Sequence, residues 1–328
     1  MRLLLVLSLI AGCRDARTHA PSPQVHPVVL DAHAGATDLY GGEGLLMSFT
    51  QDWEKPGPLR LSRGRGPVAR TLQGWPIGVV GDRGYVLEPA GDQERVLRVG
   101  LAGDPELLAT IPAAPALYRN VGTVTGSGHV VLAISEGEKP TRIEVIAPDR
   151  TTRELSLVRD SDAIVALVGD PSGSSFALIT SYAHGSASDQ SAITLVDAAT
   201  GATRWSLSMP PLWATEGPAA FVGDKLAVQL RSGIWGYDVA TGATAKLLDL
   251  EDLDARRIAF GPRGEALAWV HWVHPSDVMP LSDRHACEVY AARAGEPAPT
   301  SPAISYETGC YFGTGVVFVG DALWVAPR

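Results

Sequence analysis

Lysine is scarce in this 328-residue chain, and the balance of charge is acidic. Only four of the 27 basic residues are Lys, the formal net charge is -9, and the basic residues form no cluster. A nucleic-acid-binding domain needs a basic patch, so the composition argues against a nucleic-acid partner. The same scarcity excludes a polybasic segment that would hold anionic lipid.

Familiar catalytic motifs are missing as well. The chain contains no G-x-S-x-G, no H-E-x-x-H and no G-x-x-x-x-G-K-[ST] pattern. These patterns position a nucleophilic serine, a catalytic zinc ion or a nucleotide phosphate. The sequence therefore names no reaction, and we expect no cofactor.

Long apolar runs are also absent. The longest run, Leu3–Ile10, is shorter than half of the roughly 20 residues that a membrane-spanning helix requires. It follows Arg2 and precedes the small residues Ala11 and Gly12. A positive start, a short apolar stretch and small residues together predict a secretory signal peptide over residues 1–12.

The end of this segment, Ile10-Ala11-Gly12-Cys13, resembles the lipobox of bacterial lipoproteins. The resemblance implies that Cys13 is lipidated and anchors the protein in a membrane of the bacterial cell envelope, facing the periplasm or the cell surface. Arg14 rather than Asp follows the cysteine, which favours the outer membrane by the rule of enteric lipoproteins. A secreted protein with an incidental Cys13 is the alternative. Residues 13–27 hold three prolines and predict an extended tether.

Cysteine is scarce too: besides Cys13, the chain has only Cys287 and Cys310. An even number of remaining cysteines in an oxidising compartment predicts a disulfide between them. Two buried free thiols are the alternative.

Glycine and proline are abundant, with 35 and 24 residues, and glycine marks a repeat. Seven times a short β-rich run is followed by a tight glycine turn and a second apolar run. Such turns need a residue that tolerates positive φ, which predicts hairpins. The first glycines of the seven turns lie 38 to 59 residues apart and are Gly41, Gly81, Gly126, Gly169, Gly223, Gly261 and Gly320.

A second hairpin pattern lies between these turns. Ile193–Leu207 and Ile234–Leu250 each read as a strand, a D-x-x-T-G turn and another strand, and Ile143–Leu157 is a degenerate copy. Two hairpins per unit of 40 to 50 residues predict an all-β protein, a β-propeller of four-stranded blades over residues 28–328.

Seven inner hairpins predict seven blades, and six blades are the alternative. The last hairpin ends near Arg328 with only two strands made. The segment Pro27–Leu30 is therefore expected to supply a closing strand from the other end of the chain.

The copy LVDAATGATRW resembles the repeat consensus of PQQ-like propellers, and the whole repeat pattern resembles the PQQ-like and WD40-like superfamilies. In this resemblance Trp205 takes the place of the blade tryptophan, which the other copies lack. The resemblance implies an architecture and no particular activity. Quinoprotein dehydrogenases usually also carry an adjacent cysteine pair, which this chain lacks, so no PQQ cofactor is expected.

The segments that enter the innermost strands are expected to lie on one face, around the central channel. Their mixed aromatic and charged residues suggest a docking face or a pocket for a polar or glycan-like ligand. The structural alternative is that they cap the channel. The candidate residues are Trp75, Tyr118, Arg119, Asp160, Asp162, Trp213, Glu216, Arg256, Arg257 and Tyr311, with His33 and Asp38 beside them.

Histidines and aspartates also gather in HWVHPSDVMPLSDRH, residues 271–285. These residue types bind metals. However, His271 and His274 are three apart on a predicted strand and would point to opposite faces. We expect a polar loop and no metal site.

These observations predict a lipid-anchored envelope propeller that acts as a binding or assembly module without catalysis of its own. An envelope protein or a glycan is the expected partner. The alternative is a propeller enzyme of hydrolase, lyase or cyclase type, with its site at the mouth of the channel.

Overall fold

The computed structural model describes residues 27–326 except for fifteen short stretches or single positions. These are 42–43, 51–55, 115–119, 136–139, 158–161, 183–190, 210–218, 231–232, 250–254, 261–265, 274–285, 294–298, 300, 307–315 and 320–321 within that range, together with 327–328 after it. Within the described part the chain forms strands and one 3-10 turn, η1 (Asp31–His33). No helix in that part is long and apolar enough to cross a membrane.

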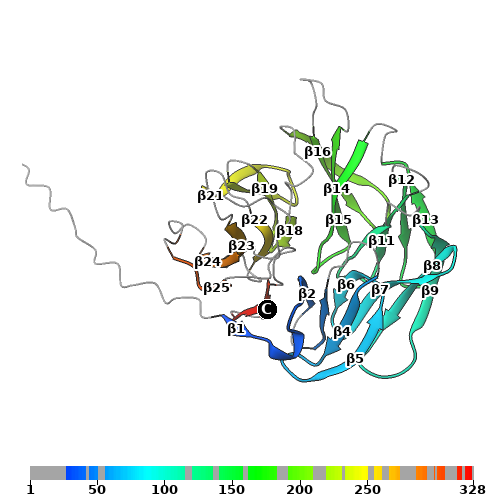
Figure 1. The fold of residues 1–328 in the computed structure, drawn as a ribbon. Coiled ribbons are helices and arrows are strands. Elements are labelled where there is room, and N and C mark those ends of the chain that lie inside the picture. The colour runs from blue at the N-terminus through cyan, green and yellow to red at the C-terminus, as the bar shows by residue number, and fades with distance from the viewer. Residues whose placement is uncertain are drawn as a thin grey trace, which may run out of the picture.

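The strands form seven sheets in which chain neighbours pair antiparallel, as Figure 1 shows. The innermost strands are β2 (Asp38–Gly41), β6 (Trp75–Val80), β10 (Val121–Val124), β14 (Asp162–Gly169), β18 (Ala219–Val222), β22 (Ala255–Phe260) and β26 (Val316–Val319). The second strands are β3 (Leu46–Phe49), β7 (Arg83–Ala90), β11 (Val130–Ser135), β15 (Ser175–Tyr182), β19 (Lys225–Leu230), β23 (Ala266–Val273) and β27 (Ala322–Val325). The third strands of the first six sheets are β4 (Pro58–Ser62), β8 (Gln93–Val99), β12 (Pro140–Ile146), β16 (Ser191–Asp197), β20 (Gly233–Asp238) and β24 (Ala286–Arg293). Their outermost strands are β5 (Val68–Gln73), β9 (Glu106–Pro112), β13 (Thr152–Leu155), β17 (Thr203–Met209), β21 (Thr244–Asp249) and β25 (Ile304–Tyr306).

The sheets close into a ring. Each innermost strand contacts the innermost strands of both neighbouring sheets, and β26 of the last sheet contacts β2 of the first. The predicted β-propeller class is confirmed, and the seven sheets agree with the predicted number of blades.

The seventh sheet is completed from the other end of the chain. Strand β1 (Val28–Val29) pairs with β27, with Val28 opposite Trp324 and Val29 opposite Val325. The N–H of Leu30 extends this pairing by donating to the Val325 carbonyl at 3.0 Å. The predicted closing strand is therefore confirmed.

This closure has two further features. The pairing of β1 is parallel, because the chain must run in the direction of β27 to reach the side of the ring where β2 begins. The seventh sheet has three strands in the described part, the two strands of the last hairpin and the closing strand. Residues of both neighbouring sheets contact it: the Arg65 guanidinium, between β4 and β5, lies 5.1 Å from the Trp324 ring, and the Tyr306 hydroxyl of β25 donates to the Ala326 carbonyl at 3.3 Å.

Sheet faces pack against each other around the ring. Strand β11 shows the rule: Val130, Leu132 and Ile134 join the core between the second and third sheets, while Val131 and Ala133 join the core between the third and fourth. Side chains alternate across a strand, so a strand buried on both faces must be apolar throughout. This explains the continuous apolar runs that follow the glycine turns.

The two sides of the ring carry different connections. We call the side where the innermost strands begin the entry face, and the opposite side the turn face. Connections of eight or more residues at the entry face are 30–37, which contains η1, and 50–57, 113–120, 183–190, 210–218, 274–285 and 307–315. At the turn face only 294–303 is that long, and the other connections have two to six residues.

Turn-face connections are held by their own side chains. In the two D-x-x-T-G turns, Asp197 Oδ1 accepts hydrogen bonds from the Thr200 N–H and hydroxyl at 2.9 and 3.0 Å. Asp238 accepts the same pair from Thr241 at 2.8 and 2.7 Å. The following glycines, Gly201 and Gly242, have left-handed φ values of 75° and 73°. Such Asx turns depend on local sequence, which is why the motif predicts them.

Each D-x-x-T-G turn also receives a hydrogen bond from the preceding sheet. The Trp205 indole N–H donates to the Val239 carbonyl at 3.0 Å, and its ring lies where a Cβ on Gly242 would approach within 3.3 Å. The first D-x-x-T-G turn, which follows Asp197, packs on β13, and β13 contains no tryptophan. There Leu155 packs near Gly201 and Arg153 donates to the Ala199 carbonyl at 3.1 Å.

The seam between the third and fourth sheets brings two backbones into direct contact at the turn face. The Gly126 N–H donates to the Asp170 carbonyl at 2.7 Å, and the Ser127 N–H donates to the Gly173 carbonyl at 3.0 Å. A Cβ on Gly169 would lie 2.2 Å from the Val124 carbonyl oxygen. Glycine is required at position 169 by this approach.

Candidate functional site

The predicted face residues that lie in described strands sit at the entry ends of the innermost strands. Trp75 begins β6, Asp162 begins β14, and Arg256 and Arg257 are in the first half of β22. The side chains of Asp162, Arg256 and Arg257 are outside the description. The remaining candidates lie outside the described residues: Tyr118, Arg119, Asp160, Trp213, Glu216 and Tyr311.

Trp75 is a packing residue as well as a residue of the entry face. Its half-buried ring meets the Phe49 ring edge-on, with centroids 5.8 Å apart and an interplanar angle of 62°. It packs against the core between the first two sheets and against the core between the second and third. This position favours the structural interpretation for Trp75.

His33 was expected beside the entry face but is fully buried, so this expectation is wrong. Its Nδ1 lies 2.7 Å from the Ser48 hydroxyl and its Nε2 lies 2.8 Å from the Ser62 hydroxyl. Because Ser62 donates its own proton to the Gly64 carbonyl at 2.9 Å, the network assigns the ring proton to Nε2. Nδ1 then accepts from Ser48, and the imidazole is neutral.

The surroundings of His33 disfavour its charged form. Burial, with a smaller contribution from the Arg60 charge, lowers the pKa of His33 to about 4. His33 follows β1 directly and bonds to β3 and β4, so it fixes the segment that joins the seventh sheet to the first.

A buried carboxyl group fixes another entry-face connection. The Asn120 side-chain amide donates to Glu94 Oε2 at 2.8 Å and to the Pro112 carbonyl at 2.9 Å. These bonds join the end of the 113–120 connection to β8 and to the end of β9, where the connection begins. Burial raises the pKa of Glu94, although the bond from Asn120 opposes it. The sequence analysis missed Glu94; strand alternation with the buried Val96 was the available signal.

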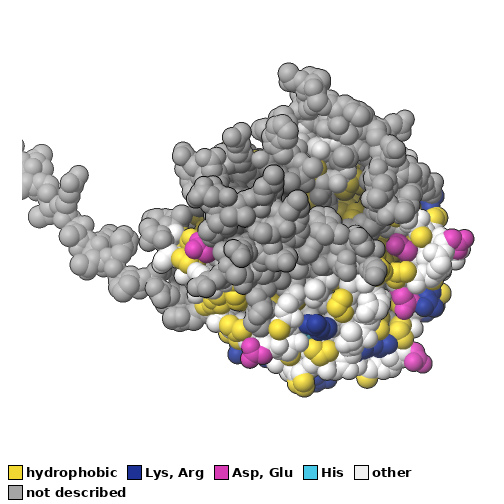
Figure 2. All heavy atoms as spheres, in the orientation of Figure 1, with side chains coloured by type: hydrophobic (Ala, Val, Ile, Leu, Met, Phe, Trp, Pro, Cys, Tyr) yellow, Lys and Arg dark blue, Asp and Glu magenta, His cyan; other side chains and the backbone are white. Residues whose placement is uncertain are grey.

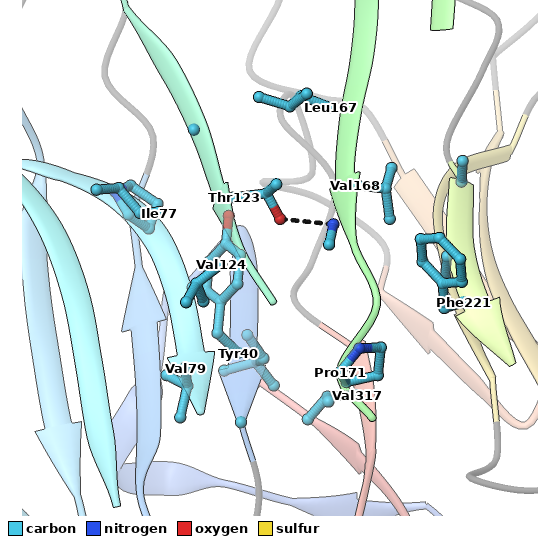
Figure 3. Close-up of a pocket in the computed structure, with 18 residues that line it drawn as sticks. Tyr40, Ile77, Val79, Thr123, Val124, Leu167, Val168, Pro171, Phe221 and Val317 are labelled. Atoms are coloured by element: carbon cyan, nitrogen blue, oxygen red, sulfur yellow. Dashed lines mark hydrogen bonds between the residues drawn. The ribbon is translucent and has the colours of Figure 1, made fainter. Parts of the chain in front are cut away.

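The central channel holds a cavity of about 450 Å³, shown in Figure 3. Its described lining comes from β2, β6, β10, β14, β18 and β26 and from Pro171 beyond β14, and it contains no Asp, Glu, Lys, Arg or His. The Thr123 hydroxyl oxygen in this wall accepts a hydrogen bond from the Gly169 N–H at 2.8 Å. The charged side chains that were expected around the channel are not among these described lining residues, because they lie outside the description.

Charged groups lie instead on the outside of the ring, where acidic and basic side chains are interspersed (Figure 2). Arg98 binds Glu106 Oε2 through Nε and Nη2 at 2.9 and 2.6 Å, and Arg150 binds Oε1 of the same carboxylate at 2.7 Å. The hydrogen bond from Arg98, with that from Arg150, lowers the pKa of Glu106. Exposed pairs of this kind contribute little stability.

Most residues of the predicted metal-binding and disulfide sites lie outside the described residues. His271 lies in β23, but its side chain and residues 274–285 are not described. Within the described part no three His, Cys, Asp or Glu side chains gather as metal ligands. Cys287 is fully buried in β24, and Cys310 is outside the described residues.

Comparison with known proteins gives a likeness of fold. No protein-family model and no curated protein matches the sequence. The structure is similar to Raptor from Chaetomium thermophilum, with 12% identity, a TM-score of 0.55 and coverage of 89% of this chain. The chain spans only 26% of Raptor. It is also similar to the β-propeller domain of Cps50 (Swd1) from Myceliophteria thermophila, with 14% identity, a TM-score of 0.55 and coverage of 87% of this chain and 90% of that domain. At these identities the likeness shows one thing, the β-propeller fold.

Proposed function

We propose that this chain is a lipid-anchored β-propeller of the bacterial cell envelope that binds a protein or glycan partner through its entry face, as a binding or assembly module. The observation that carries the proposal is the difference between the two faces of the ring. Long connections gather at the entry face, whereas the turn face has mainly short turns held by their own hydrogen bonds. Binding residues are concentrated on loops that a rigid scaffold positions.

The position of the N-terminus supports an anchored orientation. Strand β1 runs parallel to β27, which starts at the turn face and ends at the entry face. The chain before Val28 therefore leads toward the turn face. A tether over residues 13–27, held by lipid at Cys13, would reach roughly 40 Å if extended and would leave the entry face pointing away from the membrane.

A photo-crosslinking experiment tests the use of the entry face. A photoreactive phenylalanine is placed at Gln93 or Tyr118 for the entry face, and at Asp224 for the turn face. Gln93 and Asp224 are both exposed; Gln93 directly follows a two-residue turn and Asp224 lies in one, so Asp224 is the matched control. We expect one discrete adduct in intact cells from the entry-face probes and none from Asp224. Adducts from Asp224 alone, or from no position, would contradict the proposal.

The anchor is tested separately. Cys13→Ala should move the protein from the membrane fraction to the soluble fraction and abolish labelling by a fatty-acid analogue. If the variant stays in the membrane fraction, lipid at Cys13 is not the anchor. The entry-face proposal can be judged independently from the crosslinks.

We also propose that Cys287 and Cys310 form a disulfide. Cys287 is fully buried in β24. It lies opposite Tyr306, the last residue of β25, and Cys310 follows four residues later. Thiol titration of the denatured, unreduced Cys13→Ala protein should find no free thiol. Two free thiols would contradict the pairing.

A further inference from the structure

The ring is closed by a short segment with little backbone pairing. We call residues 28–36 the closing segment; it contains β1, η1 and most of the residues that lead to β2. Its pairing with β27 covers only Val28 and Val29, and the N–H of Leu30 adds one hydrogen bond. Every other pair of neighbouring strands has three or more residues in register. A segment with so few backbone bonds can open while the rest of the protein stays folded.

Side chains therefore carry much of the closure. Leu30 is buried and packs with Trp324 in the core between the seventh and first sheets. His33 is fully buried, and its ring nitrogens lie 2.7 Å from the Ser48 hydroxyl in β3 and 2.8 Å from the Ser62 hydroxyl in β4. These two hydrogen bonds join the closing segment to the first sheet.

The hydrogen bonds of His33 are complete only with a neutral ring. The Ser62 hydroxyl donates to the Gly64 carbonyl at 2.9 Å, so its oxygen accepts from Nε2, while Nδ1 accepts from Ser48. A proton on Nδ1 would turn that nitrogen into a second donor. The Ser48 hydroxyl would then need another acceptor, and the described part of the chain provides none. A buried donor without an acceptor is costly.

The charge that acts on His33 also opposes its protonation. Burial, and after it the positive charge of Arg60, lowers the pKa of His33 to about 4. Arg60 also donates to the Ala34 carbonyl at 2.8 Å, which places it at the closing segment itself. The other described charged residues on the surrounding elements, or directly beside them, are Asp31, Asp38, Arg63 and Arg65, and β3 and β27 contain none. Neither carboxylate bonds to His33, because both ring nitrogens face serine hydroxyls.

We propose that the closing segment is an acid-sensitive switch: protonation of His33 releases residues 28–36 from the ring while the first six sheets stay folded. In the released segment the imidazole is in water and binds a proton that the closed form excludes. Between pH 6.5 and about 4 the opening equilibrium therefore increases by about tenfold for each pH unit. Release would uncover the edge of β27 and the apolar side chains that pack with Leu30. This proposal does not depend on lipidation or on the partner of the entry face.

Amide hydrogen exchange at about pH 7 and about pH 5 tests the release, with each rate divided by the intrinsic rate at the same pH. We expect protection of peptides from residues 28–36 to fall about tenfold or more at the lower pH. Protection of peptides from β11, in the third sheet, should stay unchanged. Equal protection of the closing segment at both pH values would overturn the proposal, and so would an equal loss in β11.

A matched pair of variants assigns the effect to His33. In His33→Gln the side-chain amide is neutral at both pH values and has a donor for Ser62 and an acceptor for Ser48. His129, which is half-buried between β10 and β11, makes His129→Gln the control. The pH-dependent loss of protection should vanish in the first variant and remain in the second. A loss in His33→Gln as large as in the wild type would overturn the proposal.

The position of the transition covers the case in which His33→Gln does not close the ring. The charged residues between β3 and β4 that lie outside the described residues are Asp52, Glu54 and Lys55. Ordinary carboxyl groups titrate near pH 4 and lysine near pH 10, whereas a histidine in water titrates near pH 6.5. In the unaltered protein, protection of the closing segment should therefore already fall about tenfold between about pH 6 and pH 5. Unchanged protection across this interval would overturn the proposal.

Discussion

The two faces of the ring hold their connections in different ways. At the turn face the hydrogen bonds of an Asx turn are made within four residues, as between Asp197 and Thr200. The neighbouring sheet then packs against that turn. At the entry face the described anchors join residues distant in sequence: His33 with Ser48 and Ser62, and Glu94 with Asn120. Local turn chemistry therefore stabilises one face, while the other depends on buried polar side chains.

The largest expected effect is at the turn-face seam between the third and fourth sheets. Gly169→Ala would place a Cβ 2.2 Å from the Val124 carbonyl oxygen, so two backbones must separate. We expect a loss of about 3 kcal/mol or more in the free energy of unfolding, measured by denaturant titration. Gly103→Ala is the control, because Gly103 has a φ of 81° but nothing within 4 Å of an added Cβ. It should cost about 1 kcal/mol through strain alone. An equal loss of unfolding free energy in the two variants would show that the two backbones at the seam lie farther apart than described.

The next effect is a pH dependence of the closure through His33. The pKa of His33 is about 4 in the folded protein and 6.5 as its ordinary value, so the unfolded chain binds more protons between these values. The stabilising contribution is complete above pH 6.5 and is lost as the pH falls toward about 4, by up to about 3 kcal/mol. The difference in unfolding free energy between the wild type and His33→Gln should follow this window. A difference that is constant with pH would contradict the neutral, buried assignment.

Glu94 should give a pH dependence of opposite sign. Its pKa is raised in the folded protein, so the folded state holds the proton more tightly and the contribution weakens as the pH rises through the ordinary carboxyl range. Glu94→Gln keeps the shape and removes the charge. At neutral pH we expect thermal unfolding to move upward by an amount equivalent to about 1 kcal/mol. A lower melting temperature would mean that the ionised carboxylate has a stronger partner than Asn120.

The smallest expected effect separates the two D-x-x-T-G turns. Burial raises the pKa of Asp197, but hydrogen bonds from Arg204, Thr200 and Ser174 outweigh it and the net shift is downward. The pKa of Asp238 is lowered mainly by its hydrogen bonds to Thr241. Asp197→Ala should therefore lower the melting temperature by the equivalent of about 1 kcal/mol, and Asp238→Ala by less. The reverse order would show that contacts outside the turn do not matter.

Much of the architecture could be predicted from the sequence. The seven inner hairpins, the D-x-x-T-G hairpins and the closing strand at Val28–Val29 all occur where their patterns place them. The entry ends of β6, β14 and β22 likewise carry the predicted Trp75, Asp162 and Arg256. Turn glycines and strand alternation are local signals, so they can be found without knowing the partners.

The character of the site could not be predicted in the same way. His33 looks like a surface residue in a polar segment, but Ser48 and Ser62 are 15 and 29 residues away and only the closed ring brings them to it. Trp75 looks like a binding residue, but Phe49 from another sheet covers part of it.

The sequence by itself determined the repeated hairpins, their turns and the need for a strand from the N-terminus, because each follows from backbone preferences over a few residues. The tertiary structure alone decided that β1 pairs parallel, that the seventh sheet has three strands in the described part, and that the described channel wall is uncharged. These features arise only when seven innermost strands from distant parts of the chain meet around one axis. No local sequence pattern determines which of their side chains lie next to each other around that axis.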